Sequence, residues 1–225
     1  MDTPEMIAAE YLRRNVEIDI GTAVKRGWEL VMANMNVLVV ATVLTWAINV
    51  GLGFIPVIRW GGGVILGSVL HAGLMLMFIR RIRGERVELG DLFAGFNMAL
   101  PLIIAGLLTS ALTIVGFILC ILPGIYLAVS YLFVLPLIID KKLDFWPAME
   151  VSRQVVYKHW WAMFLLAIVL VLIICVGAAA CGVGLILAAP LAIAAVSYVY
   201  EDLFGAVGSA AQVITPAPAG PTVTA

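Results

Sequence analysis

The sequence predicts an all-α fold: a six-transmembrane-helix bundle built from three helical hairpins, each preceded by an interfacial amphipathic helix. Three observations predict it. Of the 225 residues, 64% are hydrophobic and 12% are charged, about half the charged share of a soluble domain. The mean hydropathy is +1.12, and the charges gather in clumps between long uncharged gaps. With a net charge of −1, these features exclude a soluble enzyme, a nucleic-acid-binding protein and a disordered chain.

The uncharged gaps place the spans. They cover residues 30–58, 60–79, 92–139 and 159–200. A membrane helix needs about 20 apolar residues, so each of the two longest gaps holds two spans and a turn, which Gly and Pro place near 120–124 and 177–184. The apolar runs do not alternate, which favours helices over a barrel. The expected spans are 37–55, 60–79, 99–120, 123–139, 161–180 and 184–200.

Charge predicts the orientation of the spans. Twelve of the 13 Lys and Arg residues fall on one side of a six-span arrangement, and only Arg59 falls on the other. The positive-inside rule then places both termini in the cytoplasm. Residues 1–17 form an N-terminal cytoplasmic segment, 18–207 the membrane domain and 208–225 a disordered cytoplasmic tail. Aromatic residues at the expected interfaces read as anchors: Trp28, Trp146, Tyr157, Trp160, Trp161 and Tyr200 on the inner side, and Trp60 on the outer side.

A weak repeat underlies the three hairpins. Asn49-Val50-Gly51, Ile114-Val115-Gly116 and Cys175-Val176-Gly177 recur at the outer turns. An amphipathic stretch precedes each hairpin, and such stretches lie in the inner headgroup layer. The first carries Val24, Trp28, Val31 and Met35, and the second contains Gly90-Asp91-Leu92-Phe93, echoed by Asp202-Leu203-Phe204. The third starts at Asp144 with an apolar face of Ala148, Val151, Val155 and His159 and a polar face of Glu150, Arg153, Gln154, Tyr157 and Lys158.

A family resemblance rests on residues between 122 and 161. They are Leu122-Pro123-Gly124-Ile125-Tyr126, Pro136, Asp140, Ala148, Ser152 and Trp160-Trp161. In this order they resemble bacterial six-span integral membrane proteins of unknown function, including the membrane domain fused to some glycerophosphodiester phosphodiesterases. The resemblance implies the fold and a bacterial inner (plasma) membrane. It implies no activity, and no catalytic phosphodiesterase domain is expected here.

His71 is the one ionisable residue expected deep inside a span. It lies nine residues before Arg80, or about 13 Å along a helix. Such a residue can serve as an axial ligand of a tetrapyrrole or as a proton relay. The simpler interpretation is a neutral histidine bonded to a neighbouring helix, so we expect no cofactor. The other histidine, His159, lies at a different depth, which argues against a haem held between the two.

Polar residues predict a shared outer cavity. Asn49, Thr113 and Tyr126 are expected around it, with Arg59 above it to attract an anionic head group or solute. The alternative is interhelical hydrogen bonding with an outer charge anchor. Small residues at Gly63, Gly67, Gly106 and Ser110 favour helix contacts within the bundle. Cys120, Cys175 and Cys181 are expected as small packing residues, although a periplasmic face could oxidise a pair, and no acid or histidine accompanies them to bind a metal.

No catalytic machinery is visible in the sequence. Ser-His-Asp sets, an HExxH motif and a phosphate-binding loop are missing from it, and Asp140 reads as a solvated, paired charge at the end of a span. We therefore expect a protein without enzymatic activity that binds or passes a lipid, an apolar small molecule or an anion through its helix bundle. The alternative is a structural or accessory subunit of a larger membrane protein complex. Expected partners are membrane lipids and such a complex, and no nucleic acid.

Overall fold

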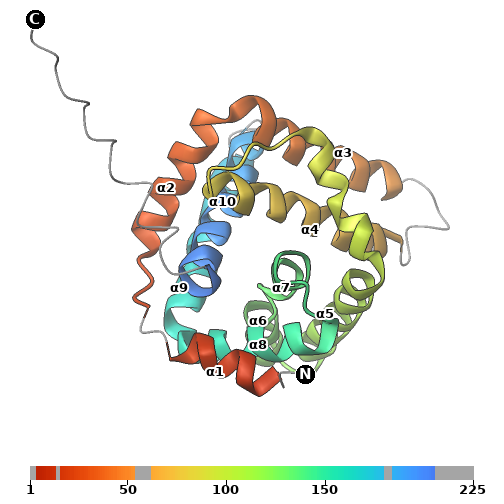
Figure 1. The fold of residues 1–225 in the computed structure, drawn as a ribbon, viewed down its shortest axis with the longest axis vertical. Coiled ribbons are helices and arrows are strands. Elements are labelled where there is room, and N and C mark those ends of the chain that lie inside the picture. Colours follow the sequence, from red (N-terminus) through yellow and green to blue (C-terminus); the bar gives the residue numbers. More distant parts are fainter. Residues whose placement is uncertain (1–3, 14–15, 54–61, 180–183, 206–225) are drawn as a thin grey trace, which may run out of the picture.

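The computed structural model describes residues 4–13, 16–53, 62–179 and 184–205, and every regular element in these ranges is a helix (Figure 1). The elements are α1 (Pro4–Leu12), α2 (Ile20–Ala33), the π-helix η1 (Met35–Val39), α3 (Val40–Gly53), α4 (Gly62–Ile82), the 3₁₀-helix η2 (Leu89–Met98), α5 (Ala99–Leu119), α6 (Ile121–Ser130), α7 (Val134–Lys141), α8 (Phe145–Lys158), α9 (Trp160–Ala179) and α10 (Leu185–Phe204). The predicted all-α class is confirmed.

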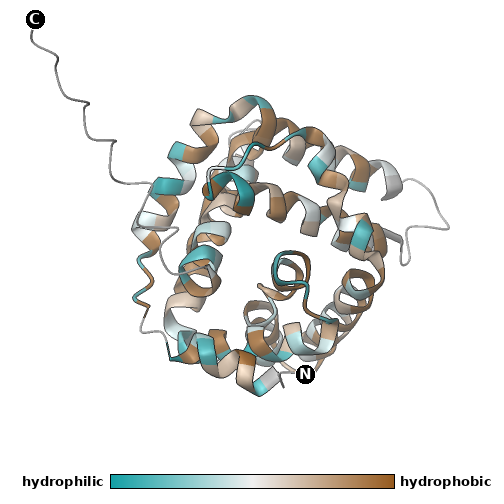
Figure 2. Ribbon diagram, in the orientation of Figure 1, coloured by the Kyte–Doolittle hydropathy of each residue, from teal (hydrophilic) through white to brown (hydrophobic). Residues whose placement is uncertain are grey.

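Five helical segments within the described ranges are long and apolar enough to cross a bilayer. They are Gly63–Ile82, Leu89–Leu119, Ile121–Lys141, Trp160–Ala179 and Leu185–Phe204. A sixth is added if Ile20–Ala33 and Met35–Gly51, which meet at an angle of 94°, count as one bent span. Figure 2 shows hydrophilic colours on α2, on α8 and at the end of α4, while α5 is coloured mostly hydrophobic.

The hairpins are joined in a closed cycle. The second helix of each hairpin packs against the helix that opens the next one: α4 against η2, and α7 against α8. The last helix, α10, packs against α2, which opens the first hairpin. The expected plan of an opening helix followed by a hairpin is therefore present, and the third unit closes on the first.

The sharp bend after α2 has a local cause at Asn34. Its side-chain Nδ2 donates to Leu30 O at 2.9 Å, which satisfies a carbonyl at the end of α2. Its Oδ1 accepts from Arg81 Nε at 2.6 Å, which ties the bend to the end of α4. At the other end of α2, Asp19 caps the helix by accepting from Thr22 N at 3.1 Å.

The face of α2 that packs inside the protein consists mainly of small residues. Ala23, Gly27 and Val31 are buried, whereas Trp28 and Met35 are exposed. A Cβ on Gly27 would lie 3.1 Å from the backbone nitrogen of Ala195, so the two helices approach closely at this glycine. Small residues therefore face α10, and the large apolar residues of α2 are left on the outside.

The second opening helix is a 3₁₀-helix pressed against α4. A Cβ on Gly73 would lie 2.0 Å from Leu92 O, and a Cβ on Gly95 would lie 2.2 Å from Val69 O. The two glycines thus let the backbones of α4 and η2 touch. Asp91 pairs with Arg80 (Oδ1 to Nη1, 3.1 Å) and fastens the start of η2 to the end of α4.

The third opening helix, α8, follows the prediction. Asp144 caps its start, and Ala148, Val151 and Val155 are buried. On the polar face, Glu150 accepts hydrogen bonds from Arg153 and from the Gln154 side chain, and these bonds hold the pKa of the Glu150 carboxyl below its usual value.

Two features of the fourth span differ from expectation. The chain turns at Cys120 alone, and α6 begins at Ile121, so Pro123 lies in the first turn of a helix, where proline is tolerated. The span is also broken between Ser130 and Val134. Ser152 Oγ of α8 donates to Ser130 O at 2.7 Å across this break. A side chain of the neighbouring helix α8 therefore satisfies a backbone carbonyl at the interruption.

Candidate functional site

The ends of three spans meet in a buried charge cluster. Arg83 follows α4 and holds Asp140 of α7 through two hydrogen bonds, Nη1 to Oδ1 at 2.6 Å and Nη2 to Oδ2 at 2.9 Å. Its Nε donates to Glu201 of α10. Tyr200 donates its hydroxyl to Asp140 Oδ2 at 2.9 Å, and Lys141 Nζ lies 3.4 Å from the same oxygen.

This cluster corrects two expectations. The side chain of Asp140 is 6% exposed, so the residue is paired as predicted but is not solvated. Tyr200 is fully buried in the core and is not an interface anchor. The hydrogen bonds to Asp140 outweigh burial and raise the pKa of the Arg83 guanidinium above its usual value. Opposite charges thus satisfy one another inside the protein, and the cluster acts as a structural tie.

Two of the predicted ligand-binding residues come together in the structure. Asn49 of α3 and His71 of α4 both line a cavity of about 540 Å³. The other lining residues are Thr45, Trp46, Val50 and Gly67.

Thr113 and Tyr126 do not line this cavity. Thr113 lies on α5, and Tyr126 on α6 packs against Trp160 at a ring-centroid distance of 5.1 Å. Arg59 lies outside the described residues, so the cavity expected beneath it stays a prediction. Cys181 lies outside them as well, while Cys120 and Cys175 are free thiols at exposed positions.

Two of the small residues predicted to favour helix contacts, Gly67 and Gly106, make close contacts within the chain. A Cβ on Gly106 of α5 would lie 2.6 Å from Ser68 Cβ of α4. A Cβ on Gly67 would lie 3.0 Å from Asn49 Oδ1. Gly63 has nothing within 4 Å of such a Cβ.

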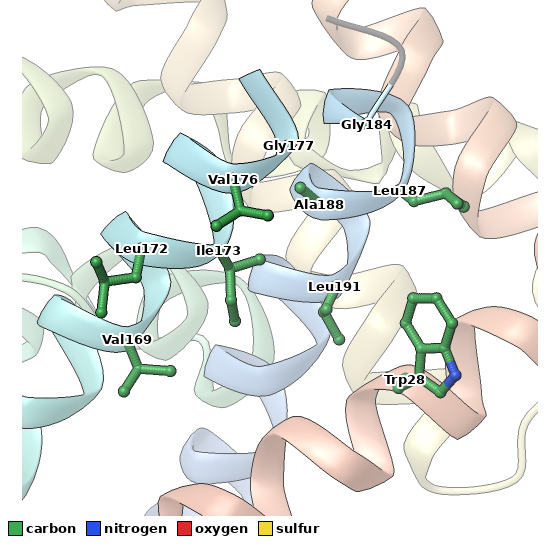
Figure 3. Close-up of a pocket in the computed structure, with 10 residues that line it drawn as sticks. All are labelled: Trp28, Val169, Leu172, Ile173, Val176, Gly177, Gly184, Leu187, Ala188 and Leu191. Atoms are coloured by element: carbon green, nitrogen blue, oxygen red, sulfur yellow. The ribbon is translucent and has the colours of Figure 1, made fainter. Parts of the chain in front are cut away.

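An apolar groove that the sequence did not predict lies between α9, α10 and α2. Its volume is about 450 Å³, and Figure 3 shows α9 along one side, α10 in the middle and Trp28 of α2 on the other side. Hydrocarbon side chains, two glycines and one indole line it: Trp28, Val169, Leu172, Ile173, Val176, Gly177, Gly184, Leu187, Ala188 and Leu191.

Close packing at one end of the two helices shapes this groove. A Cβ on Gly177 would lie 2.7 Å from Ala188 Cβ, and a Cβ on Gly184 would lie 2.6 Å from Gly177 O. The helices therefore touch at Gly177 and Gly184, whereas most of α9 is left uncovered: Met163, Leu166 and Gly177 are its buried residues. Gly177 and Gly184 were the signal in the sequence for this close helix contact, but they were interpreted only as evidence for a turn.

The fold and its surfaces define a multi-pass integral membrane protein. The chain belongs to the family described as the membrane domain of glycerophosphoryl diester phosphodiesterase, which matches residues 97–211, just over half of the sequence. The resemblance predicted from residues 122–161 is therefore confirmed.

Curated relatives come from mycobacteria. An uncharacterised protein of Mycobacterium bovis is 27% identical over 149 residues, which cover 66% of this chain and 45% of the relative. Two uncharacterised proteins of Mycobacterium tuberculosis match over the same length at 27% and 26% identity. The chain thus spans less than half the length of these relatives. No solved structure matches it.

Proposed function

We propose that this protein binds the hydrocarbon chain of a membrane lipid in the groove between α9, α10 and Trp28. The groove itself is the observation that carries the proposal. Its volume of about 450 Å³ lies within the range of about 300–1,000 Å³ that is usual for small-molecule sites. Its lining holds apolar molecules by contact and contains no ionisable group, so the proposed activity is binding without catalysis.

The bilayer is the natural source of the occupant. Leu172 on the wall of the groove is 58% exposed, and most of α9 is uncovered by protein, so the groove is accessible from the side where lipid surrounds a membrane helix. Trp28 offers an apolar ring with a polar N–H, the combination that favours the boundary between hydrocarbon and head groups.

The test compares two neighbouring residues of α9. Leu172 lines the groove, whereas Val171 does not line it and is exposed to a similar extent, 61% against 58%. Leu172→Trp is expected to fill the groove and to reduce the lipid retained after purification in mild detergent. Val171→Trp adds the same bulk on the outer surface and should retain lipid as the unmodified protein does.

Native mass spectrometry of the three proteins measures the retained lipid. Equal retention in both tryptophan variants would overturn the proposal. The same sample tests the second candidate function, a subunit of a membrane complex. The exposed apolar residues along α5 form a surface that either lipid or a partner helix can cover: Ile114, Val115, Ile118 and Leu119. A stoichiometric protein that co-purifies with this chain would support that alternative.

We further propose a bacterial inner-membrane location with both termini in the cytoplasm. The support is the lopsided distribution of Lys and Arg, since only Arg59 lies beyond the expected outer ends of the spans. A green fluorescent protein fused to the C-terminus should fluoresce, and an alkaline phosphatase fused there should be inactive. The opposite pattern would place the C-terminus outside the cytoplasm.

A further inference from the structure

A second cavity, between α3 and α4, differs chemically from the groove because polar side chains line it. Its volume is about 540 Å³. The register of the two antiparallel helices sets Asn49 opposite Gly67, since a Cβ on Gly67 would lie 3.0 Å from Asn49 Oδ1. One helical turn away on each helix are Thr45 and His71, which line the same cavity.

The polar groups on α3 are only partly used by the protein. Asn49 Nδ2 donates to Thr45 O at 2.8 Å, and Thr45 Oγ1 donates to Ala41 O at 2.8 Å. These bonds fix both side chains against their own helix and leave the Asn49 Oδ1 acceptor available within the described part of the chain. Because Gly67 has no side chain, that oxygen can lie close against α4, at the edge of the cavity.

His71 has no hydrogen-bond partner among the described residues, and it is exposed on α4. It lies about 13 Å along the helix from Arg80, inside an apolar span. An imidazole in such surroundings is neutral, because a charge there is costly, and it carries one N–H donor and one acceptor nitrogen. A polar group without a partner in an apolar medium is costly as well. A hydrogen bond from a ligand to His71 therefore gains more free energy than the same hydrogen bond would gain in water.

Trp46 supplies a flat wall beside these polar groups. It lines the cavity and is 51% exposed. Its indole can stack on a planar ring. The volume lies within the range usual for small-molecule sites, and the cavity offers a donor at His71 and an acceptor at Asn49.

We propose that this cavity binds the head group of a lipid-soluble quinone. One ring carbonyl accepts a hydrogen bond from the imidazole N–H of His71, and the ring lies against Trp46. In the reduced form, a ring hydroxyl can donate to Asn49 Oδ1. The site is independent of the hydrocarbon-binding groove, because the two share no lining residue.

The experiment uses the full chain in phospholipid nanodiscs and titrates decylubiquinone, with binding followed by quenching of tryptophan fluorescence. Saturable binding is expected, beyond the partitioning seen with empty nanodiscs. His71→Leu should weaken it about 3- to 10-fold, as expected for one lost neutral hydrogen bond. His159→Leu is the matched control, since it makes the same change at the other histidine, outside this cavity, and should bind like the unmodified protein.

Two further variants separate recognition from folding. His71→Gln keeps a side-chain N–H donor and should restore most of the affinity. Leu172→Trp, which fills the groove, should leave quinone binding unchanged, so failure of one proposal is distinguishable from failure of the other. Equal affinity of His71→Leu and the unmodified protein, or quenching that never saturates, would overturn the quinone site. Phospholipid as the only molecule that binds the cavity would overturn it too.

Discussion

Arg83 and Asp140 form a two-pronged ion pair that joins the ends of two helices 57 residues apart in the sequence. The planar guanidinium matches the carboxylate in two parallel hydrogen bonds. Its remaining Nε reaches Glu201, whose side chain is 2% exposed. A single arginine therefore sets the relative positions of α4, α7 and α10, the second helices of the three hairpins.

Removing this arginine should destabilise the fold strongly. Arg83→Ala leaves two buried carboxylates without their main partner, and losing one member of a buried pair costs about 3–5 kcal/mol. Because Arg83 is partly exposed, we expect the lower end of that range, measured as thermal unfolding in detergent. Arg86→Ala removes an exposed arginine nearby and should change stability little. Equal effects of the two variants would refute the role of the cluster.

The bond across the break in the fourth span should also be measurable. Ser152→Ala removes the donor to Ser130 O and should lower the free energy of unfolding by about 1 kcal/mol. Ser197 is equally buried, but its hydroxyl donates within its own helix, to Ile193 O at 2.8 Å. Ser197→Ala should therefore cost less. If Ser152→Ala costs no more than Ser197→Ala, the contact between helices adds nothing beyond the loss of a buried hydroxyl.

Two glycines of α4 should respond to alanine in opposite ways. Gly73→Ala places a methyl group against the backbone of η2, and such overpacking costs about 1–3 kcal/mol. Gly63→Ala meets open space and should be neutral or slightly stabilising, since alanine favours a helix more than glycine does. Thermal unfolding of the pair is the measurement, and a tolerated Gly73→Ala would contradict the close approach of α4 and η2.

A glycine should be preferred where α7 ends. Lys142 has a φ of 54°, a left-handed conformation at the C-cap. A residue with a Cβ is strained there by about 1 kcal/mol, and glycine is not. Lys142→Gly should therefore raise the unfolding temperature. Lys142→Ala loses the same charge but keeps the Cβ, so it should bring no gain; a similar rise in both variants would assign the effect to charge.

Patterns along one chain predicted the helices well. The uncharged gaps placed most of the spans, since a charge inside a bilayer is costly and helix ends therefore follow the charges. The alternation of apolar and polar residues gave the buried face of α8, because a single helix with a packed side has a period that the sequence carries.

Contacts between segments distant in the chain could not be predicted from these patterns. Asp140 stands beside Lys141 and Lys142, so the sequence suggests these neighbours as its ion-pair partners. In the structure its main partner is Arg83. The break after Ser130 lies just before Pro136, which cannot donate to the carbonyl of Leu132, but the bond from Ser152 of another helix to Ser130 O left no mark in the sequence. The same holds for the second cavity: Asn49 and His71 were both singled out, but only the register of α3 against α4 brings them together.

The packing of α10 against α2 has a consequence for biosynthesis. About 150 residues separate the end of α2 from the start of α10, and translation proceeds at roughly 5–20 residues per second. For roughly 8–30 s, a nascent chain therefore presents the small-residue side of α2, with Gly27, to the translocation machinery and the surrounding lipid without its final neighbour. The closed cycle of hairpins is completed only when α10, the last helix, is inserted beside α2.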